Sequence, residues 1–144
     1  MKKSIGSHNS AKISHYLGID FGKSKIGLAI ADEETKIAFS FDTLKNDDGF
    51  WKKIREICLD ENVGKIIIGT PSYEISRDGA ENALAFAEKM KKETGIDVEL
   101  ENEMFTTKMA QAGLKEMGMR GVGKKDDSAA ARIILQSWLD RQEG

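Results

Sequence analysis

Residues 17–32 constrain the fold more than any other stretch of this chain. They read as two β-strands joined by a tight turn, and the first strand is apolar and ends on the carboxylate Asp20. The turn contains Gly22, two lysines and a serine. The second strand alternates, with Ile26, Leu28 and Ile30 on one face and Gly27, Ala29 and Ala31 on the other. An acid at the tip of a buried strand, opposite small residues, predicts a site for a metal ion or a phosphate.

The remaining hydrophobic patterns predict the order β-β-β-α-β-α-β-α-α. We expect strands at 16–20, 25–31, 37–43, 65–70 and 97–101, and helices at about 49–61, at 79–93, from 106 or 107 to 117, and from 126 or 127 to about 141. Short connections between the first three strands predict antiparallel pairing, whereas the later strands alternate with helices and predict parallel pairing. The expected fold is α/β, with a five-stranded mixed sheet flanked by helices. Strict alternation predicts that the last strand lies at an edge with one wet face, and Gly95 is expected to end the helix before it.

Composition narrows the function classes. With 22 Lys and Arg against 24 Asp and Glu, the net charge is −2, so binding to nucleic acid would need a local basic patch. The one cysteine, Cys58, excludes an internal disulfide, fits a reducing compartment and lies on a helical stripe expected in the core. No aliphatic run is long enough to span a bilayer. We expect a disordered polar tail at 1–14, a single domain at 15–144, no membrane association and a cytoplasmic location.

Three acidic residues are candidates for one site. Asp20 ends the first strand, Glu103 follows the fifth strand and Asp127 begins the last helix. Sites in open α/β sheets collect at the carboxyl ends of the strands, so the three carboxylates could converge there. Their oxygens suit Mg²⁺ or Mn²⁺, and two such ions about 4 Å apart can bind the attacking and leaving oxygens of a phosphodiester.

Each acid also has a purely structural interpretation. Asp20 fits a turn at the end of a strand, and Asp127 fits a helix N-cap. Side chains alternate along a strand, so Glu103 would continue the expected wet face, which favours a solvated carboxylate. The residues of that face are Asp97, Glu99 and Glu101. Composition and spacing leave these alternatives open.

Four segments together resemble the YqgF-type family. They are Leu17–Gly22 with Ile26–Ala29, Ile66–Pro71, Glu103–Thr107, and Asp127–Ala131 with Ile133–Gln136. The resemblance covers nearly all of residues 16–140. The members are small proteins with a ribonuclease H-like fold, described as Holliday-junction-resolvase-like and as pre-16S rRNA nucleases. The resemblance therefore implies a ribonuclease H-like sheet and a divalent-metal-dependent endonuclease, with structured RNA favoured over branched DNA as substrate.

The resemblance also assigns roles to residues. It implies that Asp20, Glu103 and Asp127 bind Mg²⁺ or Mn²⁺. It implies phosphate contacts from basic residues of the first turn and of the glycine-containing loop before the last helix, which are Lys23, Lys25, Arg120, Lys124 and Lys125. A junction resolvase would be expected to act as a homodimer, whereas a processor of one rRNA site could be a monomer.

The sequence departs from the family pattern beside Glu103. The family usually has Asp-Glu-Arg, whereas this chain has Asn102-Glu103-Met104 and so lacks a cation that would pair with phosphate. This departure supports a second hypothesis, a non-catalytic RNA-binding factor in ribosome assembly. A third, the ATP-binding fold of sugar kinases and chaperone ATPases, requires two lobes around the nucleotide, and these 144 residues supply one.

Overall fold

A computed structural model describes residues 13–71, 74, 76–103 and 127–143. Its elements are β1 (His15–Phe21), β2 (Lys25–Asp32), β3 (Phe39–Lys45), α1 (Phe50–Asp60), β4 (Val63–Thr70), α2 (Arg77–Thr94), β5 (Asp97–Asn102) and α4 (Asp127–Glu143). The strands form one sheet in the order β3-β2-β1-β4-β5. β1–β2 and β2–β3 are antiparallel, and β1–β4 and β4–β5 are parallel. This confirms the mixed sheet and the edge position of β5.

The observed ends of the elements follow local chemistry. α2 begins two residues earlier than expected, because the Ser76 hydroxyl accepts a hydrogen bond from the Gly79 backbone N–H at 3.0 Å. Gly95 ends this helix with a left-handed φ of 72°, as predicted. The expected helix at 106–117, the loop at 118–125 and residues 1–12 of the expected tail lie outside the described residues. In the part of the chain that is described, no helix has the length and apolarity to cross a membrane.

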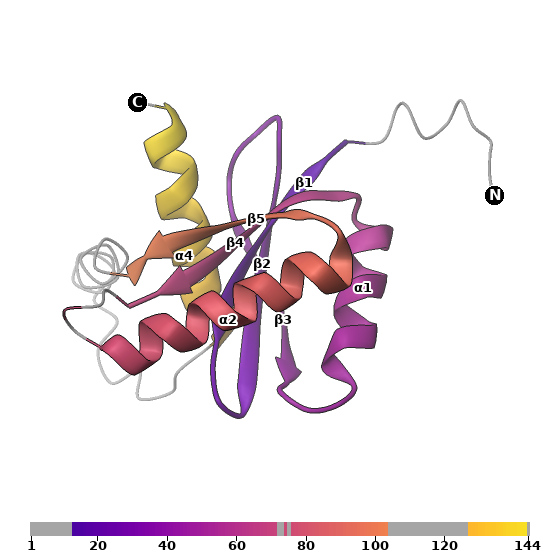
Figure 1. Cartoon of the computed structure of the whole chain (residues 1–144). Helices are drawn as coiled ribbons and strands as arrows, with labels where there is room; N and C mark the ends of the chain where they lie inside the picture. The colour runs from indigo at the N-terminus through magenta and orange to yellow at the C-terminus, as the bar shows by residue number, and fades with distance from the viewer. Residues whose placement is uncertain (1–12, 72–73, 75, 104–126, 144) are drawn as a thin grey trace, which may run out of the picture.

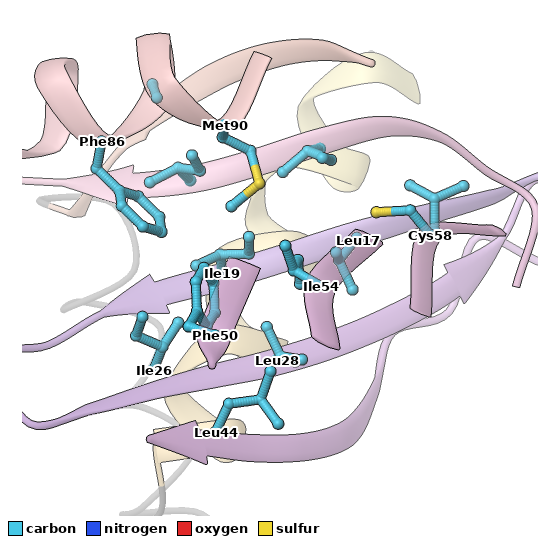
Figure 2. Close-up of a cluster of buried hydrophobic side chains, with 14 residues drawn as sticks. Leu17, Ile19, Ile26, Leu28, Leu44, Phe50, Ile54, Cys58, Phe86 and Met90 are labelled. Atoms are coloured by element: carbon cyan, nitrogen blue, oxygen red, sulfur yellow. The ribbon is translucent and has the colours of Figure 1, made fainter. Parts of the chain in front are cut away.

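The sheet has a different cover on each face. α1 and α2 pack on one face, where a core cluster includes Ile26 and Leu28 of β2 together with Phe86 and Met90 of α2 (Figure 2). α4 packs on the other face (Figure 1), and a second core cluster there includes Ala29 and Ala31 of β2. The alternation read in β2 is therefore confirmed. Cys58 belongs to the first cluster, and burial raises the pKa of its thiol to about 11, which fits a core residue.

Glycine allows α4 to lie directly on the sheet. A Cβ at Gly18 would be 2.6 Å from the Cβ of Leu135 and 3.0 Å from the backbone oxygen of Ala131. Further along the helix, the ring of Trp138 packs on that of Tyr16 with centroids 5.4 Å apart. Because its later residues meet the beginning of β1, α4 runs roughly antiparallel to β1. Its first residue therefore lies toward the end of β1 that carries Asp20.

α4 covers part of the face of β5 that we expected to be wet, whereas the side chains of Asp97 and Glu99 on that face are 58% and 42% exposed. Glu101 is fully buried, and its carboxylate accepts a hydrogen bond from the Ser137 hydroxyl at 2.8 Å and one from Arg141 Nη1 at 3.0 Å. Trp138 Nε1 donates to Glu99 at 3.0 Å. The prediction of a wet face is therefore wrong at Glu101, because polar partners on a helix distant in sequence replace the water that the alternation suggested.

An ion pair between β4 and β5 supports the packing of α4 on these strands. The Lys65 ammonium contacts the carboxylate of Glu99, which is also bound by Trp138. The hydrogen bond from Lys65 is the largest influence on the Glu99 carboxyl and lowers its pKa. A carboxyl with a lowered pKa stabilises the fold above its unfolded pKa, and this contribution is lost as the pH falls through its folded pKa.

Lys65→Met is therefore expected to lower the free energy of unfolding at neutral pH by about 0.5 kcal/mol, because the pair is partly exposed. It should also flatten the loss of stability below about pH 5, since Glu99 would titrate near its ordinary pKa in both states. Urea unfolding across the acid range measures both effects. Lys52→Met, which removes an exposed lysine of α1, is the control. An unchanged acid slope in the Lys65 variant would contradict this assignment.

Candidate active site at the carboxyl edge of the sheet

Asp20 lies on the α4 face at the end of β1. Its neighbour Ile19 belongs to the core cluster on the opposite face, and successive side chains of a strand alternate between faces. The parallel register pairs Ile19 with Ile68, which places Asp20 level with Gly69 of β4. The Asp20 side chain is half-buried. The rigid centre of the sheet therefore fixes this carboxylate at the carboxyl edge.

Glu103 follows β5 and lies at the same edge and on the same face. One of its carboxylate oxygens, Oε2, is 3.2 Å from the position that a Cβ at Gly69 would occupy. Gly69 is level with Asp20 on the neighbouring strand, and neighbouring strands lie about 4.8 Å apart. The glycine thus leaves room for the Glu103 carboxylate beside the end of β1. The half-buried side chain of Glu103 differs from the fully solvated carboxylate that the alternation along the chain favours.

The chemistry of these two acids fits a divalent cation. Burial raises the pKa of the Glu103 carboxyl, and a cation beside it would favour the charged form. Carboxylate oxygens are the ligands that Mg²⁺ and Mn²⁺ prefer. Within the described ranges, no three His, Cys, Asp or Glu side chains are grouped so as to hold a metal ion. The predicted third acid, Asp127, is the first residue of α4, and its side chain lies outside the described part of the structure.

The β1–β2 turn carries the predicted basic residues Lys23 and Lys25. Both are exposed, and Lys25 pairs with Lys45 across β2 and β3. Asn46 fixes the turn, because its side-chain amide donates to the Gly22 carbonyl at 2.9 Å and its backbone N–H donates to Ser24 at 2.9 Å. Sequence reasoning missed Asn46, since a lone asparagine after a strand gives no signal for such a contact.

The other three predicted basic residues are Arg120, Lys124 and Lys125, and they lie outside the described residues. The structure thus brings Asp20 and Glu103 to one edge, with the two lysines of the first turn near the same end of β1. This arrangement can accommodate a cation beside a phosphate. Among the described residues, the carboxylates of Asp20 and Glu103 can contact such a cation without a histidine ligand.

Comparison with known proteins identifies the family. A family model described as "RuvX: Holliday junction resolvase" matches residues 14–141. The chain belongs to this family. Of the two protein classes that could explain the motif at residues 17–32, the match favours a nuclease over a sugar kinase with an ATP-binding fold.

Curated relatives of this RuvX-family chain match over most of their length. A protein of Anaeromyxobacter sp. (strain Fw109-5) named "Putative pre-16S rRNA nuclease" is 34% identical over 134 residues, which cover 87% of this chain and 96% of the relative. A protein with the same name from Yersinia enterocolitica is 32% identical over 137 residues, with 89% and 96% covered. The resemblance read from the four segments is confirmed by these matches.

Solved structures confirm the ribonuclease H-like fold of the RuvX-family chain. RuvC of T. thermophilus, in complex with a Holliday junction substrate, matches with a TM-score of 0.61 and 14% identity, covering 91% of this chain and 96% of RuvC. The Fowlpox virus resolvase, in complex with Holliday junction DNA, matches with a TM-score of 0.55 and 13% identity, covering 90% and 99%. At such low identity these likenesses establish the fold alone.

Proposed function

We propose that this protein is a divalent-metal-dependent endonuclease that hydrolyses phosphodiester bonds of structured RNA, at the 5′ end of pre-16S rRNA. Branched DNA is the alternative substrate. The observation that carries the proposal is the position of the Glu103 carboxylate, which lies over Gly69 and beside the end of β1 that bears Asp20. Membership of a nuclease family supports the reaction class. We place the protein in the cytoplasm, in keeping with its single cysteine.

In this proposal Asp20, Glu103 and Asp127 hold Mg²⁺ or Mn²⁺. When bound, two such ions would activate the attacking water and stabilise the departing oxygen. The chain itself supplies position and electrostatics. Half-burial of Asp20 and Glu103 strengthens their attraction for a cation, because less water competes with it. Hydrogen bonds from Asn46 hold the turn, so that Lys23 and Lys25 can meet phosphates of the substrate.

The basic residues before α4 complete the proposed contact with nucleic acid. Arg120, Lys124 and Lys125 would neutralise further phosphates of the same strand. A single cut in RNA requires only one chain, whereas symmetric cuts in a four-way junction require a homodimer. The missing arginine at Met104 supports the competing function, a non-catalytic RNA-binding factor in ribosome assembly.

A cleavage panel tests the proposal. Precursor rRNA ends, single-stranded oligonucleotides and four-way junctions are incubated with the protein and either Mn²⁺ or Mg²⁺, and a chelator serves as the control. We expect cleavage of the precursor RNA that stops when the metal is chelated. Cleavage of junctions alone would replace RNA with branched DNA as the substrate. RNA binding without any cleavage would favour the assembly factor.

A further inference from the structure

A groove of about 480 Å³ lies next to the β1–β2 turn, between this turn, α1 and α2. It is lined by Phe21, Lys23, Asn46, Trp51, Asn82, Ala85, Phe86 and Lys89. Phe21 follows Asp20 in β1 and packs against the core cluster beneath α1 and α2. The groove is therefore on the opposite face of the sheet from the candidate acids, but at the same end of β1.

Aromatic rings form the floor of this groove. Phe21 stacks on Phe86 with ring centroids 4.3 Å apart, and Trp51 lies 5.5 Å from Phe86 at an interplanar angle of 44°. Phe50 meets Trp51 edge-on at 5.0 Å. These contacts hold the Trp51 indole in place, while its partial exposure leaves surface open to the groove. A fixed indole is a suitable platform for the stacking of a nucleobase.

The charged side chains that line the groove are all positive. The charged residues that line the groove are Lys23 and Lys89, and the other polar residues are asparagines. This differs from the whole chain, whose net charge is −2. Lys89 Nζ lies 5.0 Å from the centroid of the Trp51 ring. An occupant that complements these features has a flat ring and negative charges beside it.

We propose that this groove binds a single-stranded segment of the nucleic acid substrate, outside the bond that is cleaved. A base stacks on Trp51, and the flanking phosphates pair with Lys23 and Lys89. Stacking of the base displaces Lys89 from the indole, because such stacking is stronger than an exposed cation–π contact, and the ammonium then pairs with a phosphate. Asn82 offers its amide to the base or sugar, while the amide of Asn46 holds the turn that carries Lys23. The proposal rests on the proposed nuclease function for the identity of its ligand.

Binding of a fluorescein-labelled oligouridylate, measured by anisotropy in the presence of a chelator, tests the groove without cleavage. Each phosphate contact on a single strand contributes about 0.7 to the slope of log affinity against log salt. We expect Lys23→Ala and Lys89→Ala each to reduce that slope by about 0.7 between about 50 and 200 mM salt. Trp51→Leu should weaken binding about tenfold and leave the slope unchanged, because it removes stacking and no charge.

A matched control lies on the same helix. Lys91→Ala removes an exposed lysine of α2 that does not line the groove, and it should bind like the parent protein. Thermal melting checks that Trp51→Leu folds; if it does not, the Lys89 variant decides the result. An unchanged slope in the Lys89 variant would overturn the proposal, because Lys23 also contacts phosphate in the proposed active site. Displacement of the labelled oligonucleotide by uridine monophosphate as effectively as by unlabelled oligonucleotide would also overturn the proposal, since the groove would then bind a single nucleotide.

The same measurement separates this inference from the nuclease proposal. If binding depends on the groove residues but the parent protein does not cleave when metal is restored, the nuclease function is overturned and the proposal for the groove stands. Cleavage that is unaffected by Lys89→Ala, together with an unchanged salt slope, would overturn the groove and leave the nuclease function in place.

Discussion

Asp20→Asn is expected to reduce Mn²⁺-dependent cleavage at least about a hundredfold while leaving the protein folded. The substitution keeps the size of the side chain but removes a negative charge from the end of β1. A bound metal contributes several kcal/mol of charge stabilisation in the transition state, and each 1.4 kcal/mol corresponds to about a factor of ten in rate. Cleavage of the preferred substrate of the panel, at saturating Mn²⁺, measures the loss.

The matched control for this variant is Asp60→Asn. Asp60 is the last residue of α1 and precedes β4, so it lies near the amino end of that strand and away from the carboxyl edge. Its substitution should leave the cleavage rate unchanged. Melting temperatures of both variants should stay close to that of the parent protein. If Asp20→Asn cleaves as fast as Asp60→Asn, Asp20 is not a catalytic residue.

Gly18→Ala is expected to lower the free energy of unfolding by about 1–3 kcal/mol, the usual cost of overpacking a core. The new methyl group would lie 2.6 Å from the Cβ of Leu135 and 3.0 Å from a backbone oxygen of α4. Neither group is the flexible end of a side chain, so the helix itself must move away from β1. Urea unfolding measures the change in stability.

Gly64→Ala provides the control for this effect. Gly64 also lies in a strand, but the nearest atoms to a new methyl group there are those of Ser14 at 4.0 Å. We expect its stability to change by less than about 0.5 kcal/mol. Equal stability of the two glycine variants would show that α4 does not depend on a close approach to β1.

The sequence predicted those parts of the fold that depend on local pattern. Alternation in β2 placed Ile26 and Ala29 on opposite faces, and the glycine after α2 marked the end of that helix. Asp20 was predicted to end its strand because an apolar run leads directly to it, and it lies one residue before the observed end of β1. These features need only a few neighbouring residues, which is why a single sequence was enough.

The features that the sequence did not reveal depend on contacts between distant elements. Glu101 alternates like a solvated residue, but it is buried, and Ser137 and Arg141 of α4 donate hydrogen bonds to its carboxylate. Trp51 and Lys89 come from two helices and meet only in the folded chain. The alternation of side chains along one strand cannot show which helix will cover that strand. The same limit applied to Glu103, whose environment is set by Gly69 on the adjacent strand.

The central claim is that Asp20 and Glu103 belong to one divalent metal site at the carboxyl edge of the sheet. Paramagnetic broadening of backbone amide signals by substoichiometric Mn²⁺ tests it most directly, because it locates even a weakly bound ion without a substrate. We predict that the signals of Asp20, Gly69 and Glu103 broaden first, and that Asp20→Asn abolishes the effect. Broadening centred elsewhere on the protein, or unchanged broadening at these residues in the variant, would contradict the claim.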